Sequence, residues 1–132
     1  MVAIADTRAR LDAEASVLER IATHAPLDEI LDLLVTAVEA QLPGSLGSLL
    51  LLDPTTRTLH AGAVHSLPAS YNEAIEGVAI GPDVGSCGTA AHLGRAVFVS
   101  DIATDPRWAN YRDLALAHDL RACWSTPVLS RR

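Results

Sequence analysis

The sequence has few aromatic residues, few cysteines and no long hydrophobic run. Aromatic residues make up 4% of the 132 residues, and the two cysteines are Cys87 and Cys123. Two cysteines are too few for a disulfide framework, so we expect reduced thiols and a cytoplasmic location. No apolar run approaches the roughly 20 residues of a membrane-spanning helix, and charged residues from Asp6 onward argue against a secretion signal. We therefore expect no membrane partner.

Basic residues are also scarce. The net charge is -6, and apart from Arg131 and Arg132 near the end the basic residues form no cluster. A protein that binds nucleic acid usually carries a basic patch, so we expect no nucleic-acid partner. Hydrophobic residues nevertheless make up 49% of the chain. That proportion, at this length, is typical of one small globular domain with a single core.

Residues 7–25 are predicted to form an N-terminal helix, with Asp6 or Thr7 as its cap. Apolar residues recur there at helical spacing, at Leu11, Ala15, Leu18, Ile21 or Ala22, and Ala25. This narrow, alanine-rich stripe suits contact with a second copy of the same helix. The alternative is a helix that folds back on its own domain. We interpret residues 1–26 as a dimerisation or signalling helix and residues 27–132 as a separate domain.

A second helix is predicted from Asp28 to before Pro43, with a buried face that packs on a sheet. Short apolar runs at 48–52 and 58–64 are predicted strands, and a short helix over 67–75 places Tyr71 beside a pocket or on the sheet. His60 and His65 fall on opposite faces of the second strand, which argues against a shared metal site. We predict no metal-ligating residues.

The stretch around which the domain is organised is Gly85-Ser86-Cys87-Gly88-Thr89-Ala90-Ala91. Its glycines allow a tight turn into a helix, with Ser86 as the predicted N-cap and Gly94 as the stop. Cys87 falls in the first turn, where the helix dipole favours a thiolate. The thiol is either a redox or ligand-contacting group or a small buried apolar residue.

Strands are predicted at 96–100 and 121–129, with a helix over 110–118 between them. Asp101 and Asp105 are interpreted as capping residues rather than a general acid and base. Trp108, Tyr111 and Arg112 form an aromatic and cationic cluster that is able to close a pocket. Asp119 is expected in a left-handed conformation where the helix ends.

Taken together, these motifs resemble a GAF domain. The residues that carry the resemblance are Gly81-Pro82, Gly85 to Ala91, Asp101-Ile102, Asp105-Pro106 and Ala122-Cys123-Trp124-Ser125-Thr126-Pro127. The similarity covers about residues 27–129 and is greatest to the bacterial subfamily found beside PAS, histidine-kinase, GGDEF and EAL modules, as in two-component systems. It implies an α+β fold with a central antiparallel sheet, usually of six strands, flanked by helices.

The chain departs from this family in two places. Only about four strands are predicted, so we expect a C-terminally incomplete GAF domain with an unpaired sheet edge. Either the chain is a fragment, or a partner subunit covers this edge. Relatives generally have glycine where this chain has Asp119.

The resemblance implies a non-catalytic sensory module that binds a small molecule and signals through its terminal helices in a homodimer, toward an output domain. The predicted ligand-binding residues are Tyr71, Ser86, Cys87, Trp108, Tyr111 and Arg112. The ligand and any cofactor stay unidentified. One alternative is an enzyme similar to free methionine-(R)-sulfoxide reductases, which share the Gly-x-Cys-Gly-Thr-Ala-Ala stretch, although Cys123 does not match their catalytic cysteine. A second alternative is a dimerisation scaffold without a ligand.

Overall fold

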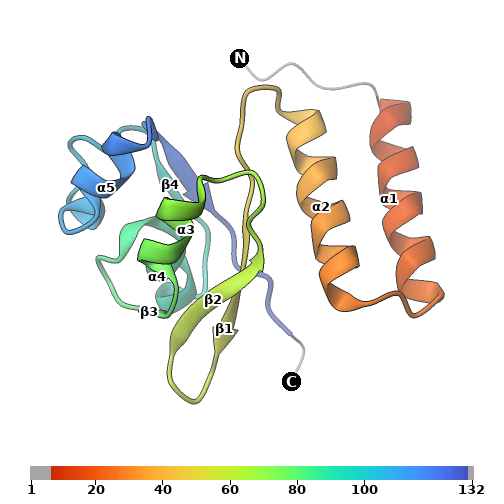
Figure 1. Ribbon diagram of the computed structural model, residues 1–132, viewed down its shortest axis with the longest axis horizontal. Helices are drawn as coiled ribbons and strands as arrows, with labels where there is room; N and C mark the ends of the chain where they lie inside the picture. Colours follow the sequence, from red (N-terminus) through yellow and green to blue (C-terminus); the bar gives the residue numbers. More distant parts are fainter. Residues whose placement is uncertain (1–6, 131–132) are drawn as a thin grey trace. The chain divides into compact units, whose positions relative to one another are not determined.

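The computed structural model describes residues 7–130 (Figure 1). Asp6, one of the two predicted caps of the first helix, lies outside the described residues. The helices are α1 (Thr7–Ala22), α2 (Leu27–Gln41), α3 (Ala69–Ile75), α4 (Gly85–Leu93), the 3-10 helix η1 (Pro106–Trp108) and α5 (Arg112–Ala117). The strands are β1 (Leu49–Asp53), β2 (Thr58–Ala63), β3 (Val78–Ala79), β4 (Val97–Val99) and β5 (Cys123–Ser125).

The strands confirm the predicted α+β fold with antiparallel pairing. One sheet has the order β1–β2–β3, with Thr58 opposite Ala79 and Leu59 opposite Val78. The other joins β4 to β5. The sequence predicted four strands, and the structure adds β3, which is only two residues long. Within residues 7–130, hydrogen bonds therefore group the strands into two sheets rather than one.

Two compact units divide the chain. The first comprises the residues up to Leu49 together with Ala61–Leu67, and the second comprises Leu50–His60 together with the residues from Pro68 onward. β1 and β2 each contribute residues to both units. The units are described separately below.

The first unit is built on the hairpin of α1 and α2, which lie side by side (Figure 1). α2 buries Leu31 and Val35 against Ala63 of β2 and Leu49 of β1, which confirms that this helix packs on strands. Arg20 of α1 and Glu29 of α2 form an ion pair at 3.0 Å. The apolar spacing of α2 thus produces the buried face that the sequence predicted.

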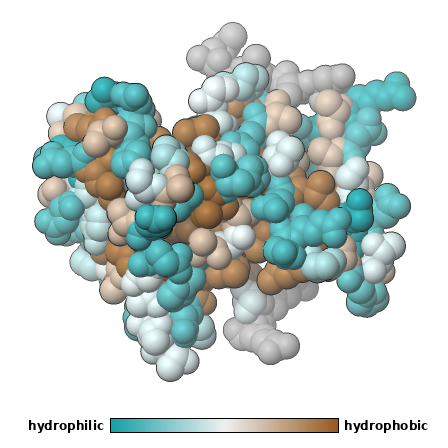
Figure 2. Space-filling model, in the orientation of Figure 1, coloured by the Kyte–Doolittle hydropathy of each residue, from teal (hydrophilic) through white to brown (hydrophobic). Residues whose placement is uncertain are grey.

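The predicted apolar stripe of α1 stays exposed. Val17 is the residue that α1 buries, whereas Leu11, Leu18 and Ile21 keep 53%, 65% and 51% of their surfaces accessible. Hydrophobic side chains accordingly lie among hydrophilic ones over this hairpin (Figure 2). α1 therefore packs on α2 through a different face from the one that the spacing of its leucines marks.

The second unit has its own core around α4. This core consists of Ala90, Val97, Val99, Ile102, Trp108 and Ala115, with Tyr111, Leu116, Leu120 and Cys123 packed against it. Side chains of β4 alternate between the core and the surface. Val97 and Val99 face the core and are 3% exposed, while Phe98 between them is 67% exposed. Phe98 lies opposite Trp124 of β5 on the outer face, with ring centroids 6.5 Å apart.

The helix ends in this unit follow the predicted signals. Gly94 ends α4 with φ 68°, and its N–H donates to the carbonyl of Ala90. Asp119 has φ 59°, which confirms the predicted left-handed residue. It is the C′ residue of a Schellman motif, because Asp119 N–H donates to Leu116 O at 3.1 Å and Leu120 N–H to Ala115 O at 3.0 Å.

Candidate functional site

The first turn of α4 approaches its neighbours so closely that two of its positions require glycine. Gly85 has φ +58°, and a Cβ there would lie 3.3 Å from Cζ2 of the Trp108 indole. A Cβ on Gly88 would lie 2.5 Å from Val84 Cγ1 and 2.6 Å from Val84 Cβ, which no side chain tolerates without movement. Both glycines thus serve the tight approach that the sequence predicted.

Ser86 is fully buried and links three elements. The Trp108 indole N–H donates to Ser86 Oγ at 3.2 Å, and Ser86 Oγ donates to the carbonyl of Cys123 at 3.2 Å. The predicted N-cap role of Ser86 is therefore wrong, because Val84 occupies the cap position. Ser86 lies inside the helix, and its hydroxyl is used to join α4 to η1 and β5.

Thr89, rather than Ser86, forms side-chain hydrogen bonds with backbone groups at the start of α4. Its hydroxyl accepts a hydrogen bond from Val84 N–H at 3.1 Å and donates to the carbonyl of Gly85 at 2.5 Å. Like Ser86, Thr89 is a buried polar residue with internal partners. Every buried hydroxyl of this turn is thus hydrogen-bonded within the protein, as such groups usually are.

Cys87 and Cys123 meet beside this turn. The nearby Cys123 thiol lowers the pKa of Cys87 to about 7, and the Ser125 hydroxyl contributes to the same shift against the opposing effect of burial. The Cys123 Sγ itself lies 3.8 Å from the carbonyl of Trp124, to which it donates. The pKa of Cys123 is raised by the nearby Cys87 and by burial of the thiol. The pair therefore has one thiol that ionises near neutral pH and one that keeps its proton.

Tyr71 of α3 lies near both thiols. Its side chain is buried, and its pKa is raised by burial and by the nearby Cys123 and Cys87. The ring meets His118 edge-on, with centroids 5.6 Å apart. His118 Nδ1 lies 2.9 Å from Leu114 O and its Nε2 lies 2.8 Å from Ser70 Oγ. A carbonyl only accepts, so Nδ1 carries the proton of the neutral ring and Nε2 accepts from Ser70.

The Trp108, Tyr111 and Arg112 cluster forms the wall behind Ser86. Arg112 donates from Nε to the carbonyl of Ile102 and from Nη2 to that of Asp105, both at 3.1 Å. Trp108 is 5% exposed and Tyr111 packs against the same core. The guanidinium group thus holds the loop before η1 in place, and the two aromatic rings are part of the core.

Asp105 caps η1, as predicted. Its carboxylate accepts from the backbone N–H of Arg107 at 2.9 Å and from the Arg107 side chain at 2.9 and 2.7 Å. The Arg107 guanidinium lowers the pKa of Asp105, so this carboxylate stays ionised. Asp101 accepts from Ala103 N–H at 3.0 Å and from Thr104 Oγ1 at 3.1 Å. Both acids therefore have turn-forming roles.

The two histidines of the β1–β2 region have separate partners. His60 Nδ1 lies 2.8 Å from Glu76 Oε1, whereas His65 Nδ1 lies 3.4 Å from Asp32 Oδ1. Across the described part of the chain, no three His, Cys, Asp or Glu side chains are grouped so that they would hold a metal ion. No helix within residues 7–130 has the length and apolarity to cross a membrane.

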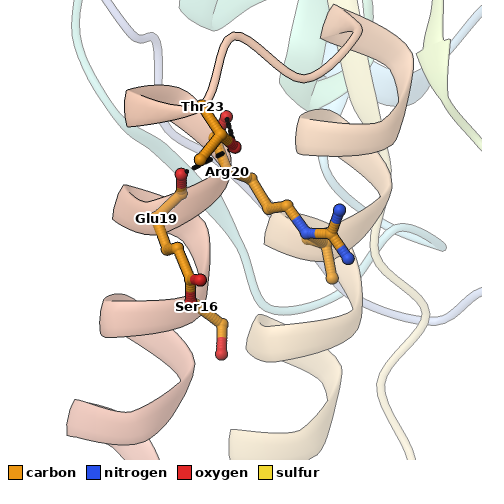
Figure 3. Close-up of a pocket in the computed structure, with 5 residues that line it drawn as sticks. Ser16, Glu19, Arg20 and Thr23 are labelled. Carbon is orange, nitrogen blue, oxygen red and sulfur yellow. Dashed lines mark hydrogen bonds between the residues drawn. The ribbon is translucent and has the colours of Figure 1, made fainter.

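A surface groove lies between α1 and α2, apart from the predicted site residues. It is lined by Ser16, Glu19, Arg20, Thr23 and Leu33. Thr23 turns its hydroxyl back to the carbonyls of Glu19 and Arg20 at 3.0 and 3.2 Å, while the Arg20 side chain reaches toward α2 (Figure 3). Four of these five residues are charged or carry a hydroxyl group, so the groove has the character of a solvated seam between two helices.

Of the predicted ligand-binding residues, Tyr71 lies near Cys87, and Ser86 shares a hydrogen bond with Trp108. The sequence prediction missed Cys123, Ser125, Ser70 and His118. Cys123 and Ser125 alternate around Trp124 and therefore share one face of β5, which was a signal available in the sequence. That this face meets α4 required the tertiary structure.

Comparison with known proteins agrees with this architecture. The family described as GAF domain matches residues 24–132. The methyl sulfide methyltransferase-associated sensor of Methanosarcina acetivorans is 43% identical over 114 residues. That match covers 86% of this chain and 11% of the sensor, so the chain spans about a tenth of the length of this curated relative. No solved structure matches the chain.

Proposed function

Because the chain belongs to the GAF domain family, we propose that it is a sensory module that binds a small molecule and signals through its terminal helices in a dimer. Two observations support a sensory role: the family match over residues 24–132 and the 43% identity to a protein named as a sensor. The sensory role of this chain is proposed by analogy with that relative, which is named as a sensor. A linked output domain and a cytoplasmic location belong to the same proposal.

The observation that carries the ligand-binding proposal is that Tyr71 of α3 lies near Cys87 of α4, close enough for the charge of the thiolate to raise the pKa of the phenol. These residues come from different helices, and together they present a phenol and an ionisable thiol. Ser86, Trp108, Tyr111 and Arg112 complete the site as its supporting wall. Their hydrogen bonds to one another and to backbone carbonyls hold the contact groups in position.

The dimer proposal rests on the exposed apolar stripes of the first unit. Leu11, Leu18 and Ile21 recur at helical spacing on α1, and Leu27, Leu34 and Val38 recur in the same way on α2. Exposed leucines repeated at such intervals are typical of helices that pack against a second copy. A partner hairpin would bury both stripes.

Native mass spectrometry of the protein purified from cells tests the proposal. We expect a dimer that carries extra mass, and the mass would identify the ligand. A dimer without extra mass would favour the scaffold alternative, and a monomer would contradict dimer signalling. Leu11→Gln with Leu18→Gln is expected to weaken the dimer, and Asp12→Gln with Glu19→Gln on the same helix is the matched control.

A second set of variants tests the ligand site. Arg112→Ala and Trp108→Phe are expected to lower affinity for the ligand that co-purifies, because both loosen the wall behind Ser86. Arg95→Ala, an exposed position after α4, is the control. Unchanged affinity in both site variants would contradict the site assignment. Circular dichroism confirms that each variant is folded before its affinity is compared.

One observation favours the reductase alternative, namely the thiol pair. A sulfoxide reductase needs a nucleophilic thiol with a second thiol within reach, and the lowered pKa of Cys87 beside Cys123 supports this alternative, although Cys123 does not match the catalytic cysteine of those enzymes. An assay with free methionine-(R)-sulfoxide and a dithiol reductant separates the two functions. The sensory proposal predicts no turnover, whereas turnover that disappears in Cys87→Ser would establish the enzyme.

A further inference from the structure

Ser70 and His118 form a hydrogen-bonded pair that the sensory proposal does not use. Ser70 Oγ lies 2.8 Å from His118 Nε2, although the two residues are 48 positions apart in the chain. Ser70 belongs to α3, and His118 is the C-cap residue of α5. Both residues lie in the second unit, so packing within this unit brings the hydroxyl and the imidazole together.

The imidazole is held in the orientation that a general base requires. His118 Nδ1 lies 2.9 Å from the carbonyl of Leu114, which only accepts, so Nε2 of the neutral ring offers its lone pair to the Ser70 hydroxyl. The Tyr71 ring packs edge-on against the imidazole, with centroids 5.6 Å apart, and restricts its rotation. Nucleophile, base and orienting group thus follow one another along two hydrogen bonds, which is the arrangement of an activated serine.

The Ser70 hydroxyl is also accessible. Ser70 is exposed and His118 is half-buried, whereas Ser86 and Thr89 are buried and use their hydroxyls internally. A small molecule can therefore reach Ser70 Oγ from solvent while the imidazole behind it is partly shielded. The pair combines access to the nucleophile with a fixed base.

A second hydroxyl–imidazole contact in the same unit gives an internal comparison. Thr58 Oγ1 lies 2.8 Å from His60 Nε2, and His60 Nδ1 lies 2.8 Å from Glu76 Oε1. The Thr58 oxygen is also in contact with Thr56 Oγ1, at 2.6 Å, and Thr58 is half-buried. Its hydroxyl is a more hindered secondary alcohol. Contact with a histidine is thus shared by both hydroxyls, whereas an exposed primary alcohol is present at Ser70 alone of the two.

We propose that Ser70 is a nucleophile that accepts an acyl group from an activated ester, with His118 as its general base. Ser70 Oγ bonds to the carbonyl carbon, and the bond from that carbon to the leaving oxygen breaks. The Ser70 proton passes to His118 Nε2 and from there to the leaving oxygen. The products are an ester on Ser70, the free alcohol and a neutral imidazole.

The size of the effect defines the class of substrate. A positioned general base accelerates such a reaction by about 10²–10⁴-fold. We therefore expect measurable attack on esters with a good leaving group. The inference concerns the hydroxyl and the imidazole alone, so it does not depend on a bound ligand or on dimer signalling.

Mass spectrometry of the full chain treated with p-nitrophenyl acetate tests the proposal. Short exposures are quenched in acid, which retains an ester on Ser70, and the protein is then digested with trypsin. Ser70 falls in the peptide of residues 58–95, where fragmentation locates the acetyl group, and the exposed Ser100 falls in the peptide of residues 96–107. We expect Ser70 to be acetylated about 100-fold faster than Ser100. Equal rates at the two serines, or acetylation of Thr58 in place of Ser70, would overturn the proposal.

The role of His118 is tested by chemical rescue. We expect His118→Ala to slow the acetylation of Ser70 by about 100-fold and added imidazole to restore part of the rate, because free imidazole replaces the missing base. His92→Ala, on the exposed side of α4, is the matched control and should keep the wild-type rate. An unchanged rate in His118→Ala would overturn the proposal, and so would a loss that imidazole does not restore, since a merely structural histidine behaves in that way.

A second variant keeps the test valid if His118→Ala does not fold. His118→Gln retains an acceptor for the Ser70 hydroxyl but is not a base. Circular dichroism establishes which variants are folded, and we expect the folded glutamine variant to acetylate Ser70 as slowly as it acetylates Ser100. Acetylation of Ser70 at the wild-type rate in His118→Gln would show that the hydrogen bond, and not proton transfer, activates the serine, and would overturn the assignment of His118 as the base.

Discussion

The Trp108 indole N–H donates to the hydroxyl of Ser86 at 3.2 Å, and that hydroxyl donates onward to the carbonyl of Cys123. Both side chains are buried, so a single hydroxyl satisfies one donor and one acceptor in the interior. It also connects the helix, the 3-10 helix and the strand that surround the thiol pair. The local order of the site depends on this relationship.

We expect Ser86→Ala to destabilise the protein by about 1–3 kcal/mol, because it leaves the Trp108 N–H and the Cys123 carbonyl without their partner in the interior. Urea unfolding followed by tryptophan fluorescence measures the change. Ser100→Ala, at an exposed position after β4, serves as the control and should leave the midpoint unchanged. Equal midpoints for the two variants would show that the hydroxyl contributes nothing to stability.

Gly88→Ala is expected to cost about 1–3 kcal/mol through overpacking. The new Cβ would meet Val84 Cγ1 at 2.5 Å and Val84 Cβ at 2.6 Å, and the latter atom is fixed to the backbone. Thermal unfolding should show a lower midpoint than for the wild-type chain. His92→Ala, on the exposed side of the same helix, controls for the helix itself. A Gly88→Ala protein as stable as His92→Ala would contradict the close approach.

Asp119→Gly is expected to stabilise the protein by roughly 0.5–1 kcal/mol. A non-glycine residue pays a steric cost at φ 59°, and glycine is the usual C′ residue of a Schellman motif. The ion pair that is lost, to Arg121 at 3.8 Å, is exposed and contributes little. Asp119→Ala removes the same charge without relieving the backbone, so its midpoint should lie below that of Asp119→Gly. The reverse order would disprove this account.

The reactivity of Cys87 should titrate with an apparent pKa of about 7. The rate of alkylation by iodoacetamide, followed from pH 5 to pH 10 by mass spectrometry of the peptide of residues 58–95, measures it. Cys123→Ala removes the donor and should raise the apparent pKa, whereas Cys123→Ser retains a donor and should raise it less. A titration that is the same in all three proteins would exclude the thiol hydrogen bond as the cause.

Stability should change with pH in the same range. The folded chain releases the Cys87 proton at a pKa of about 7, below the ordinary value of 9.0, so thiolate formation favours the folded state as pH rises from about 7 to 9. Above pH 9 the raised pKa of Cys123 acts in the opposite direction, since the unfolded chain then loses that proton first. Urea midpoints of wild-type and Cys87→Ala protein should therefore diverge between pH 7 and 9. Parallel curves would contradict the shift.

Most helices and strands were predictable because their signals are local. Gly94 and Asp119 marked helix ends through backbone conformation alone, and the apolar runs of β1, β2 and β4 marked strands. β3 escaped prediction because it is two residues long and exists only through pairing with Thr58 and Leu59. Ser86 was misassigned as an N-cap because its partners, Trp108 and Cys123, are distant in sequence.

The α+β class and the glycine-rich turn could be predicted from the amino-acid sequence because they depend on local patterns, and the family could be predicted because several short motifs together resemble a GAF domain. Only the tertiary structure decided which side chains meet. The bond from Ser86 Oγ to Cys123 O joins α4 to β5, and the absence of a Cβ at Gly85 lets the first turn of α4 lie against the Trp108 indole. Contacts between residues far apart in the chain depend on packing, which no local pattern encodes.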